Sequence, residues 1–352
     1  MTKPPLRHLL PLLVSILAPL AAAQDASPAS AVILQYHHVS ANTPRVTSVN
    51  LDEFRAHMDY LRDNGFTVLP LEDIVTALRN GDSLPDRSAA ITFDDGYRNN
   101  YDAAYSLLRE YGWPFTLFIS SDLVGSNDAL YLSWDQIREM AGNGATIANH
   151  GITHLYLLER EKEEDDDAWL KRVEHEIVTA EEKIEKETGQ GHKLFAYPYG
   201  EYDRTIQDLV ARLGFTGIGQ HSGPVNASSD FTALPRFPFS GVYASMDTFA
   251  VKVQSLAFDV QLVEPETPVT DEQMPAAVLD FDGDYRLGAL TCFNNDLPMD
   301  ISVVDEEEQQ YRIEPLEPST ARRFRYNCTA PAGNGRFYWV SVPWVNPALD
   351  DY

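Results

Sequence analysis

Three features of the chain predict an α/β fold followed by a smaller all-β region. Residues 31–257 alternate between short apolar runs and longer amphipathic segments, which predicts a parallel sheet with helical crossovers, in the form of a distorted (β/α) barrel of about seven strands. After residue 258, short strands with turn residues between them predict a small C-terminal β-sandwich over residues 258–352. A chain of 352 residues is also too long for one ordinary core.

The expected elements follow from hydrophobic periodicity. The strands of the first domain are short apolar runs, at residues 32–35, 67–69, 89–93, 115–119, 146–148, 193–196 and 216–219. The helices carry apolar residues three or four positions apart, and are expected at residues 51–64, 71–79, 101–111, 134–143, 161–188 and 205–213. The C-terminal strands are expected at residues 277–281, 287–294, 300–304, 310–313, 321–327 and 337–342.

The first 23 residues have the pattern of a signal peptide. Lys3 and Arg7 precede an apolar run over residues 9–20, and small residues up to Ala23 predict cleavage there. An exported protein, periplasmic or secreted, is therefore expected, with an uncleaved anchor as the alternative. The residue directly after the predicted cleavage site is Gln24 and not a cysteine, so a lipoprotein is not expected, and no later stretch is apolar enough to cross a bilayer.

The charge of the chain limits its partners. The net charge is −26, and it becomes −28 when the segment with Lys3 and Arg7 and no acids is removed. So acidic a surface argues against nucleic acid and against anionic membranes as partners. We interpret the acidity mainly as a means of keeping an exported protein soluble, and we expect a monomer.

Two adjacent carboxylates stand at the end of one predicted strand, in the run Thr92-Phe93-Asp94-Asp95-Gly96. At a strand's C-terminal end the chain turns, with Gly96 supplying the turn, so that both carboxylates can face one site. Two carboxylates that close repel each other unless a cation or a shared proton lies between them. The run therefore predicts a metal ion, although a solvated turn is the simpler alternative.

Further metal ligands are available in the run from Asn149 to His154, where His150 and His154 are four residues apart. Asp95 with these two histidines forms a set of two histidines and one carboxylate, which leaves coordination positions open for water and substrate. A histidine pair of this spacing occurs by chance on surface helices, so the prediction depends on its combination with the two aspartates.

These residues carry a family resemblance. The chain resembles the polysaccharide deacetylases of the NodB-homology class, whose first two motifs correspond to residues 92–96 and 150–154. The early Tyr36-His37, after an apolar strand, is similar to the branch that deacetylates poly-β-1,6-N-acetylglucosamine. The resemblance covers roughly residues 31–250 and implies removal of N-acetyl groups from an extracellular N-acetylglucosamine polymer, with the β-1,6 linkage favoured. Chitin, peptidoglycan and acetylated xylan remain alternative substrates.

The resemblance also implies roles for single residues. A divalent ion, most simply Zn²⁺ with Ni²⁺, Co²⁺ or Fe²⁺ as alternatives, would be held by Asp95, His150 and His154. Asp94 would be the general base, and His37 the general acid that protonates the departing amine. The backbone N–H of Tyr199 would help to stabilise the oxyanion. All these residues follow predicted strands, as the active-site residues of such barrels do.

The third motif departs from the family pattern. Where relatives carry Arg-x-Pro-Tyr-Gly, this chain has Ala196 in place of the arginine that pairs with the catalytic aspartate. We expect Arg236 to substitute for that arginine, with an arginine on a solvated edge as the alternative. His38 competes with His37 for the site, since only one of two adjacent residues should face it. Tyr197 is expected to stack on a sugar ring.

Cys292 and Cys328 are the chain's two cysteines, and export makes a disulfide between them the expected state, as a pin through the core of the C-terminal domain. A free reactive thiol is the alternative. For the whole chain, the competing hypothesis is a non-catalytic carbohydrate-binding or cell-surface protein. The presence of Asp94, Asp95 and both histidines of the metal set argues against it.

Overall fold

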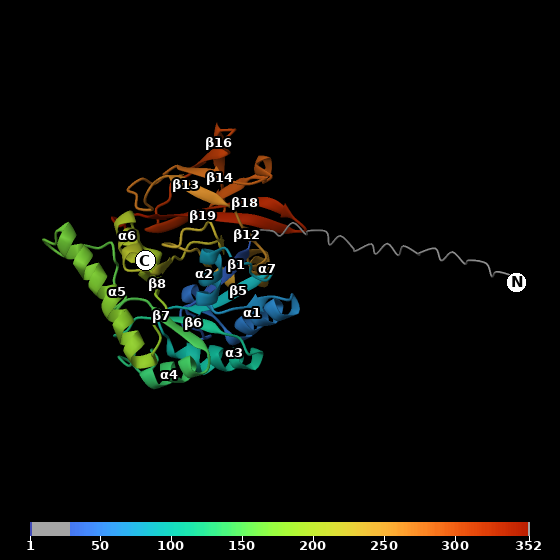
Figure 1. Ribbon diagram of the computed structural model, residues 1–352. Coiled ribbons are helices and arrows are strands. Elements are labelled where there is room, and N and C mark those ends of the chain that lie inside the picture. Colours follow the sequence, from blue (N-terminus) through green and yellow to red (C-terminus); the bar gives the residue numbers. More distant parts are fainter. Residues whose placement is uncertain (2–28, 351–352) are drawn as a thin grey trace.

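The computed structural model describes residue 1 and residues 29–350. The predicted signal peptide, residues 1–23, lies almost entirely outside the described residues. The described part contains two β-sheets, and the strands of the second lie to one side of the α/β part that precedes them (Figure 1). Among the described residues, no helix combines the length and the apolar character needed to cross a membrane.

The first sheet is the predicted curled α/β sheet, so the fold class is confirmed. Its main path has the strand order β10-β1-β5-β6-β7-β8-β9, in which the strands from β1 to β9 are parallel and β10 is antiparallel to β1. The strands are β1 (Ser30–Tyr36), β4 (Thr67–Val68), β5 (Ser88–Phe93), β6 (Phe115–Ile119), β7 (Ala145–Asn149), β8 (Leu194–Ala196), β9 (Thr216–Ile218), β10 (Pro224–Asn226) and β11 (Phe237–Pro238). A separate pair consists of β2 (His38–Val39) and β3 (Ser48–Val49).

Residues 234–239 nearly close this sheet into a barrel. Leu234 bridges to Ile218 at the end of β9, and Phe237 pairs in parallel with Leu34 of β1. The segment therefore bridges the two sides of the sheet, and its residues reach the centre of the barrel. We did not predict this strand, because Pro235 and Pro238 interrupt the apolar run and limit its regular pairing.

Helices surround the first sheet, with α1, α3, α4 and α5 on its outside (Figure 1). They are α1 (Leu51–Asp63), α2 (Leu71–Asn80), α3 (Ser106–Tyr111), α4 (Trp134–Gly142), α5 (Asp166–Thr188), α6 (Arg204–Arg212) and α7 (Met246–Val253). Capping sets their ends: Asn50 and Glu53 form a reciprocal capping box at the start of α1, and Gly81 ends α2 in a left-handed conformation. Short 3₁₀ turns occur at η1 (Arg45–Thr47), η3 (Pro198–Gly200), η4 (Gly241–Ala244) and η5 (Leu287–Ala289).

Several predicted elements differ from the structure in their bounds or type. The helix expected from residue 161 begins at Asp166, because the Asp165 side chain caps it by accepting from the N–H of Ala168. The helix expected over 101–111 begins as a π-helix, η2 (Asn100–Tyr105), and continues as α3. The strand expected over 287–294 is a 3₁₀ turn followed by β15. The short helix α7 was not predicted.

The second sheet has the order β12-β19-β18-β15-β16-β17-β14-β13 and is antiparallel except at β12. The long strand β16 pairs with β15 near its start and with β17 further on, so it joins two arms that share one apolar core. The strands are β12 (Leu256–Ala257), β13 (Val260–Glu264), β14 (Ala277–Phe281), β15 (Thr291–Asn294), β16 (Leu297–Asp305), β17 (Gln310–Pro315), β18 (Arg323–Gly333) and β19 (Arg336–Val345).

Cys292 and Cys328 are bonded as a disulfide in the core of this region. They lie directly opposite each other on β15 and β18, which are adjacent strands of one sheet. The predicted disulfide is therefore formed inside the apolar core, where it links two neighbouring strands.

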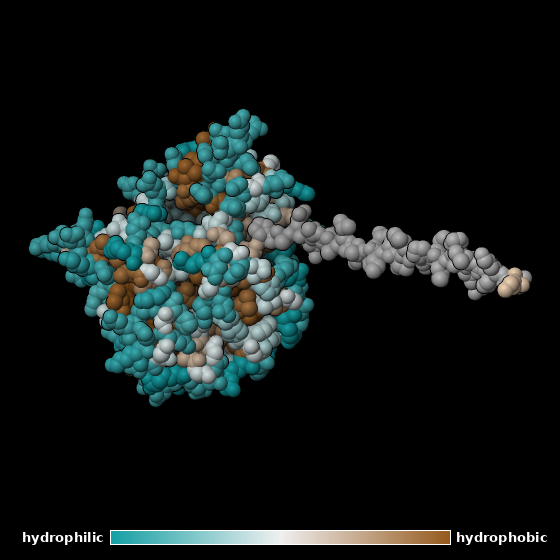
Figure 2. All heavy atoms as spheres, in the orientation of Figure 1, coloured by the Kyte–Doolittle hydropathy of each residue, from teal (hydrophilic) through white to brown (hydrophobic). Residues whose placement is uncertain are grey.

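A buried ion cluster of one glutamate and two arginines joins the two sheet regions. Glu201, which is fully buried and follows η3, accepts hydrogen bonds from Arg322 at 2.7 and 2.9 Å and from Arg323 at 2.7 Å. These arginines lie at the start of β18. The visible face of the molecule is largely hydrophilic, with scattered apolar patches (Figure 2).

Candidate metal and catalytic site

The two aspartates lie at the C-terminal end of β5, where the backbone turns sharply. Asp95 and Gly96 both have positive φ, of 72° and 70°. A side chain at position 96 would also come within 3.1 Å of the Ile119 side chain, so this turn favours glycine. The N–H of Asp94 donates to the carbonyl of Tyr36, which ties the turn to the end of β1. As a result, both carboxylates face the centre of the barrel.

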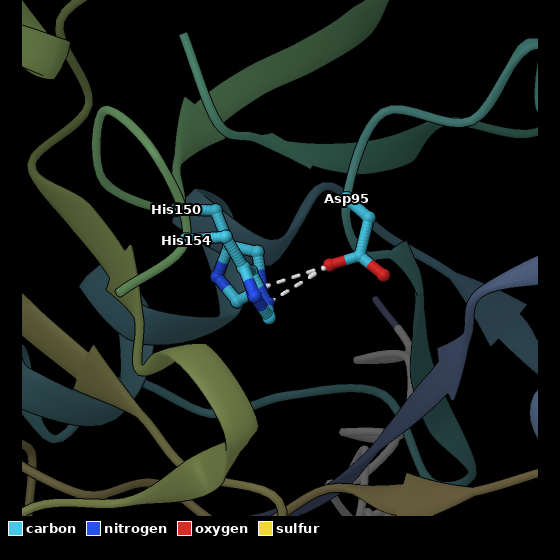
Figure 3. Close-up of side chains that lie close together, drawn as sticks. All are labelled: Asp95, His150 and His154. Atoms are coloured by element: carbon cyan, nitrogen blue, oxygen red, sulfur yellow. Dashed lines mark ion pairs between the residues drawn. The ribbon is translucent and has the colours of Figure 1, made fainter. Parts of the chain in front are cut away.

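His150 and His154 reach the same centre from the loop after β7, with their rings directed at the Asp95 carboxylate (Figure 3). The Nε2 atom of each histidine lies 3.2 Å from Oδ1 of Asp95. One candidate ligand atom from each of the three residues lies within 4.8 Å of the others. His150 is fully buried, and its Nδ1 donates to the carbonyl of Ala196 at 2.8 Å, which directs Nε2 into the site.

These residues suit a divalent cation. Asp95 Oδ1 and His150 Nε2 are buried polar atoms with no hydrogen-bond partner among the described residues. Buried polar atoms in proteins are nearly always satisfied, and two that converge on one point are explained by an ion between them. Two imidazole nitrogens and one carboxylate are ligands that Zn²⁺ and similar ions accept.

Asp94 is held separately from this set, in a fully buried ion pair with Arg236. Arg236 Nη1 and Nη2 donate to its two oxygens at 2.7 and 2.8 Å, and Gln35 Nε2 donates to Oδ2 at 2.7 Å. Burial alone would raise the pKa of Asp94, but Arg236, followed by the charges of His150 and His37, holds the pKa below its ordinary value. The carboxylate is therefore ionised and fixed in orientation.

Arg236 occupies its position because residues 234–239 close the barrel. Its Nε donates to the Gly219 carbonyl at 2.9 Å, and Nη1 also donates to the Thr92 hydroxyl at 3.1 Å. The guanidinium lies over the Phe118 ring at 5.3 Å. The expected alternative, an arginine on a solvated edge, is wrong, since the structure brings Arg236 onto Asp94 in the centre of the barrel.

His37 faces the site and His38 faces away from it. His37 Nε2 lies 4.0 Å from Oδ2 of Asp94, and its side chain is partly exposed. His38 is buried, stacks on Tyr97 with ring centroids 3.6 Å apart, and has its Nδ1 2.8 Å from the Asn99 amide. The alternation expected of adjacent residues therefore leaves His37 as the one histidine of this pair beside Asp94.

The side chains of the two tyrosines in the third motif differ in place: Tyr199 lies beside the metal set, and Tyr197 lies in the core. Tyr199 has a positive φ of 59° in η3, and its ring lies edge-on to His154, with ring centroids 4.4 Å apart. Tyr197 is fully buried among apolar residues, and its hydroxyl donates to the Thr232 carbonyl. The expectation that Tyr197 stacks on a sugar was wrong, because its side chain belongs to the core beneath the motif.

Sequence reasoning missed several residues around the site. Gln35 orients Asp94, and a polar residue inside the apolar strand before Tyr36 was the signal for it. The main-chain carbonyl of Ala196 orients His150, which no side-chain pattern could indicate. Tyr156 stacks on the Tyr199 ring at 3.8 Å, and Tyr97 stacks on Tyr131 at 5.6 Å, so aromatic rings border the metal set on two sides.

Comparison with known proteins agrees with this geometry. Residues 81–218 match the model of the polysaccharide deacetylase family. YxkH of Bacillus subtilis, whose name places it among the polysaccharide deacetylases, is 29% identical over 211 residues, which cover 59% of this chain and 71% of that protein. The poly-β-1,6-N-acetyl-D-glucosamine N-deacetylase of Escherichia coli is 24% identical over 241 residues. That match covers 58% of this chain and 36% of the relative.

A solved structure supports the fold. The Streptococcus pyogenes deacetylase PplD, in complex with acetate, superposes with a TM-score of 0.58 at 24% identity, covering 64% of this chain and 99% of that one. The match over residues 81–218 contains the aspartate pair and the histidine pair that the barrel brings together, so this part of the chain is similar to the polysaccharide deacetylase family of hydrolases.

Proposed function

We propose that the protein removes N-acetyl groups from an N-acetylglucosamine polymer outside the cell or in its envelope, with β-1,6-linked chains as the favoured substrate. The observation that carries the proposal is the separation of the two aspartates: Asp95 faces His150 and His154, and Asp94 is ionised beside His37. The E. coli relative, named as a poly-β-1,6-N-acetyl-D-glucosamine N-deacetylase, supports the choice of linkage.

In this proposal the two aspartates have different tasks. Asp95, His150 and His154 hold a divalent ion, which when bound supplies a Lewis acid that polarises the acetyl carbonyl and lowers the pKa of a water. Asp94 is ionised and aligned by Arg236, so it accepts the proton of the attacking water. His37 lies on the exposed side of Asp94, where it donates a proton to the departing amine. Acetate and a free amine are the products.

The main chain of η3 would complete the site. The backbone N–H of Tyr199 would donate to the carbonyl oxygen as negative charge develops on it, as in other oxyanion holes. The position of the Tyr199 ring against His154 supports this role, because it holds the motif beside the metal set. The stacked Tyr156 ring on its other face fixes that geometry further.

The proposal is tested by acetate release across a panel of β-1,6 and β-1,4 N-acetylglucosamine oligomers, with apo and zinc-loaded enzyme. We expect acetate from the zinc-loaded enzyme with a preference for the β-1,6 series, and none from Asp94→Asn. A preference for β-1,4 oligomers would redirect the assignment to chitin or peptidoglycan. Absence of acetate from every oligomer, with metal bound, would favour the alternative of a non-catalytic carbohydrate-binding protein.

A further inference from the structure

A cavity of about 210 Å³ is lined by residues of both sheet regions, and Tyr199 is one of them. Tyr199 and Gly200 of the third motif form one wall, and Arg323, Arg325 and Trp344 of the second sheet form another. The Tyr199 ring also contacts His154, so this cavity is one side chain away from the metal set. A polymer residue bound next to the reacting sugar would therefore lie within reach of the second sheet.

The lining of this cavity has the opposite charge to the rest of the chain. The chain has 53 acidic and 27 basic residues, yet the described residues that line the cavity include two arginines and a histidine and no aspartate or glutamate. Arg323 is already bound to Glu201 at 2.7 Å. Its neighbour Arg325 differs, because no ion pair or hydrogen bond joins its side chain to any described carboxylate.

Arg325 instead faces an aromatic ring that it shares with a second cation. Its guanidinium lies 5.8 Å from the centroid of Tyr243, and Lys252 Nζ lies 4.7 Å from the same ring. Burial, and then the charge of Arg325, lowers the pKa of Lys252 to about 7, and burial lowers the pKa of Arg325 as well. Burial, with Arg325 next, lowers the pKa of His221 to about 4. These shifts agree with a concentration of positive charge around Arg325 and Lys252.

A half-buried arginine that pairs with no described carboxylate is a departure from the usual pairing of charges, and such departures are concentrated at functional sites. Arginine matches the planar, paired oxygens of a carboxylate or a phosphate ester. Val46, Ser240 and Tyr243 also border a second hollow, so the cavity continues along the surface as a polymer would.

We propose that this cavity is an anion-binding subsite, in which Arg325 binds a carboxylate or phosphate ester on a sugar next to the one that is deacetylated. The proposal rests on the proposed function for its substrate, and it makes that substrate an anionic polysaccharide. The exposed ring of Tyr243 would contact the apolar face of the same sugar. Arg325 is then a specificity-determining residue supplied by the second sheet.

The test compares acetate release from three N-acetylglucosamine oligomers of equal length: one uncharged, one with a neighbouring uronic acid, and one with a neighbouring phosphate ester. We expect kcat/KM to be about tenfold higher for at least one anionic oligomer, as one charge-assisted pair provides. The preference should fall with added salt. In Arg325→Gln the ratio should fall to about one, and Arg325→Lys should retain part of it. Arg312→Gln, at a half-exposed arginine of the same sheet outside the cavity, should keep the ratio.

Equal kcat/KM values for all three oligomers, or an Arg325→Gln variant that keeps the wild-type ratio, would overturn the proposal. Titration of the wild-type protein with methyl glucuronide and with inorganic phosphate provides a second readout that requires no catalysis and no variant. Saturable binding of either anion that is lost at high salt is expected, and no binding of either would overturn the proposal. If no oligomer releases acetate, the proposed function fails, and this titration still decides whether the anion site exists.

Discussion

Replacing Arg236 by glutamine tests how the protein replaces the arginine missing from its third motif. The substitution removes two hydrogen bonds, of 2.7 and 2.8 Å, from a carboxylate that is completely buried. Removing one partner of a buried ion pair costs about 3–5 kcal/mol in the free energy of unfolding, because the remaining charge is left uncompensated. We therefore expect a loss of that size in urea unfolding at neutral pH, against less than about 1 kcal/mol for the exposed pair in Arg204→Gln.

The pH dependence of this loss is distinctive. In the wild type the folded pKa of Asp94 lies below its unfolded value of about 3.9, so its stabilising contribution is present above that pH and is lost as the pH falls through the folded pKa. Without Arg236, burial dominates and raises the folded pKa above the unfolded one. Ionisation then destabilises the variant at neutral pH, and acidification relieves this cost. The stability difference between the two proteins should therefore shrink as the pH is lowered.

Catalysis should change in the same direction. A general base with a raised pKa is protonated over more of the pH range, so the acidic limb of the kcat/KM profile should move to higher pH. Misorientation of Asp94 should also lower kcat by about 100-fold or more. An Arg236→Gln enzyme with the wild-type pH profile and turnover, or a stability loss that does not vary with pH, would refute the assignment of Arg236 as the residue that tunes Asp94.

Three further predictions follow from the site and the second sheet. Asp95→Asn should abolish stoichiometric binding of a divalent metal, measured by elemental analysis, and unchanged metal content would contradict the ligand set. Removing the metal from the wild type with a chelator should lower its free energy of unfolding by about 2.7 kcal/mol, compared with protein at a metal concentration 100-fold above Kd. His37→Gln should lower kcat by about 100-fold or more. The ring of His38 stacks on Tyr97, so His38→Gln should lower kcat less than about tenfold. Equal losses in the two variants would contradict the assignment of His37 as the general acid. Reduction of the Cys292–Cys328 bond, which spans 36 residues, should cost about 4 kcal/mol in urea unfolding without preventing metal binding, and an unchanged unfolding midpoint would contradict this role.

The regular elements of the barrel were predictable because their hydrophobic periods are local. β6 has the predicted bounds, and the predicted α1 and α2 differ from the observed helices by one residue at an end. The turn after β5 could be foreseen because an aspartate pair followed by glycine leaves few alternatives. The segment 234–239 was not predicted as a strand, since its partners are distant in the sequence and its prolines hide the pattern.

Side-chain direction was the harder part of the site to predict. Tyr197 and Tyr199 are two residues apart, and the sequence alone favoured the wrong one for contact with sugar, because the 3₁₀ turn between them directs Tyr197 into the core. Arg236 was proposed only because a motif arginine is missing, and its distance from Asp94 depends on closure of the barrel. The charged lining contributed by Arg325 could not be predicted, since it depends on how the second sheet packs on the first.

The central claim is that Asp94 and the metal set together hydrolyse an N-acetyl group. It is tested most directly by measuring acetate and new primary amine in parallel, during turnover of a β-1,6-linked N-acetylglucosamine oligomer by zinc-loaded wild type and by Asp94→Asn. We expect one acetate for each amine from the wild type, and a rate at least about 100-fold lower from a variant that retains its metal. Acetate release by Asp94→Asn at the wild-type rate, or none from the wild type, would contradict the account.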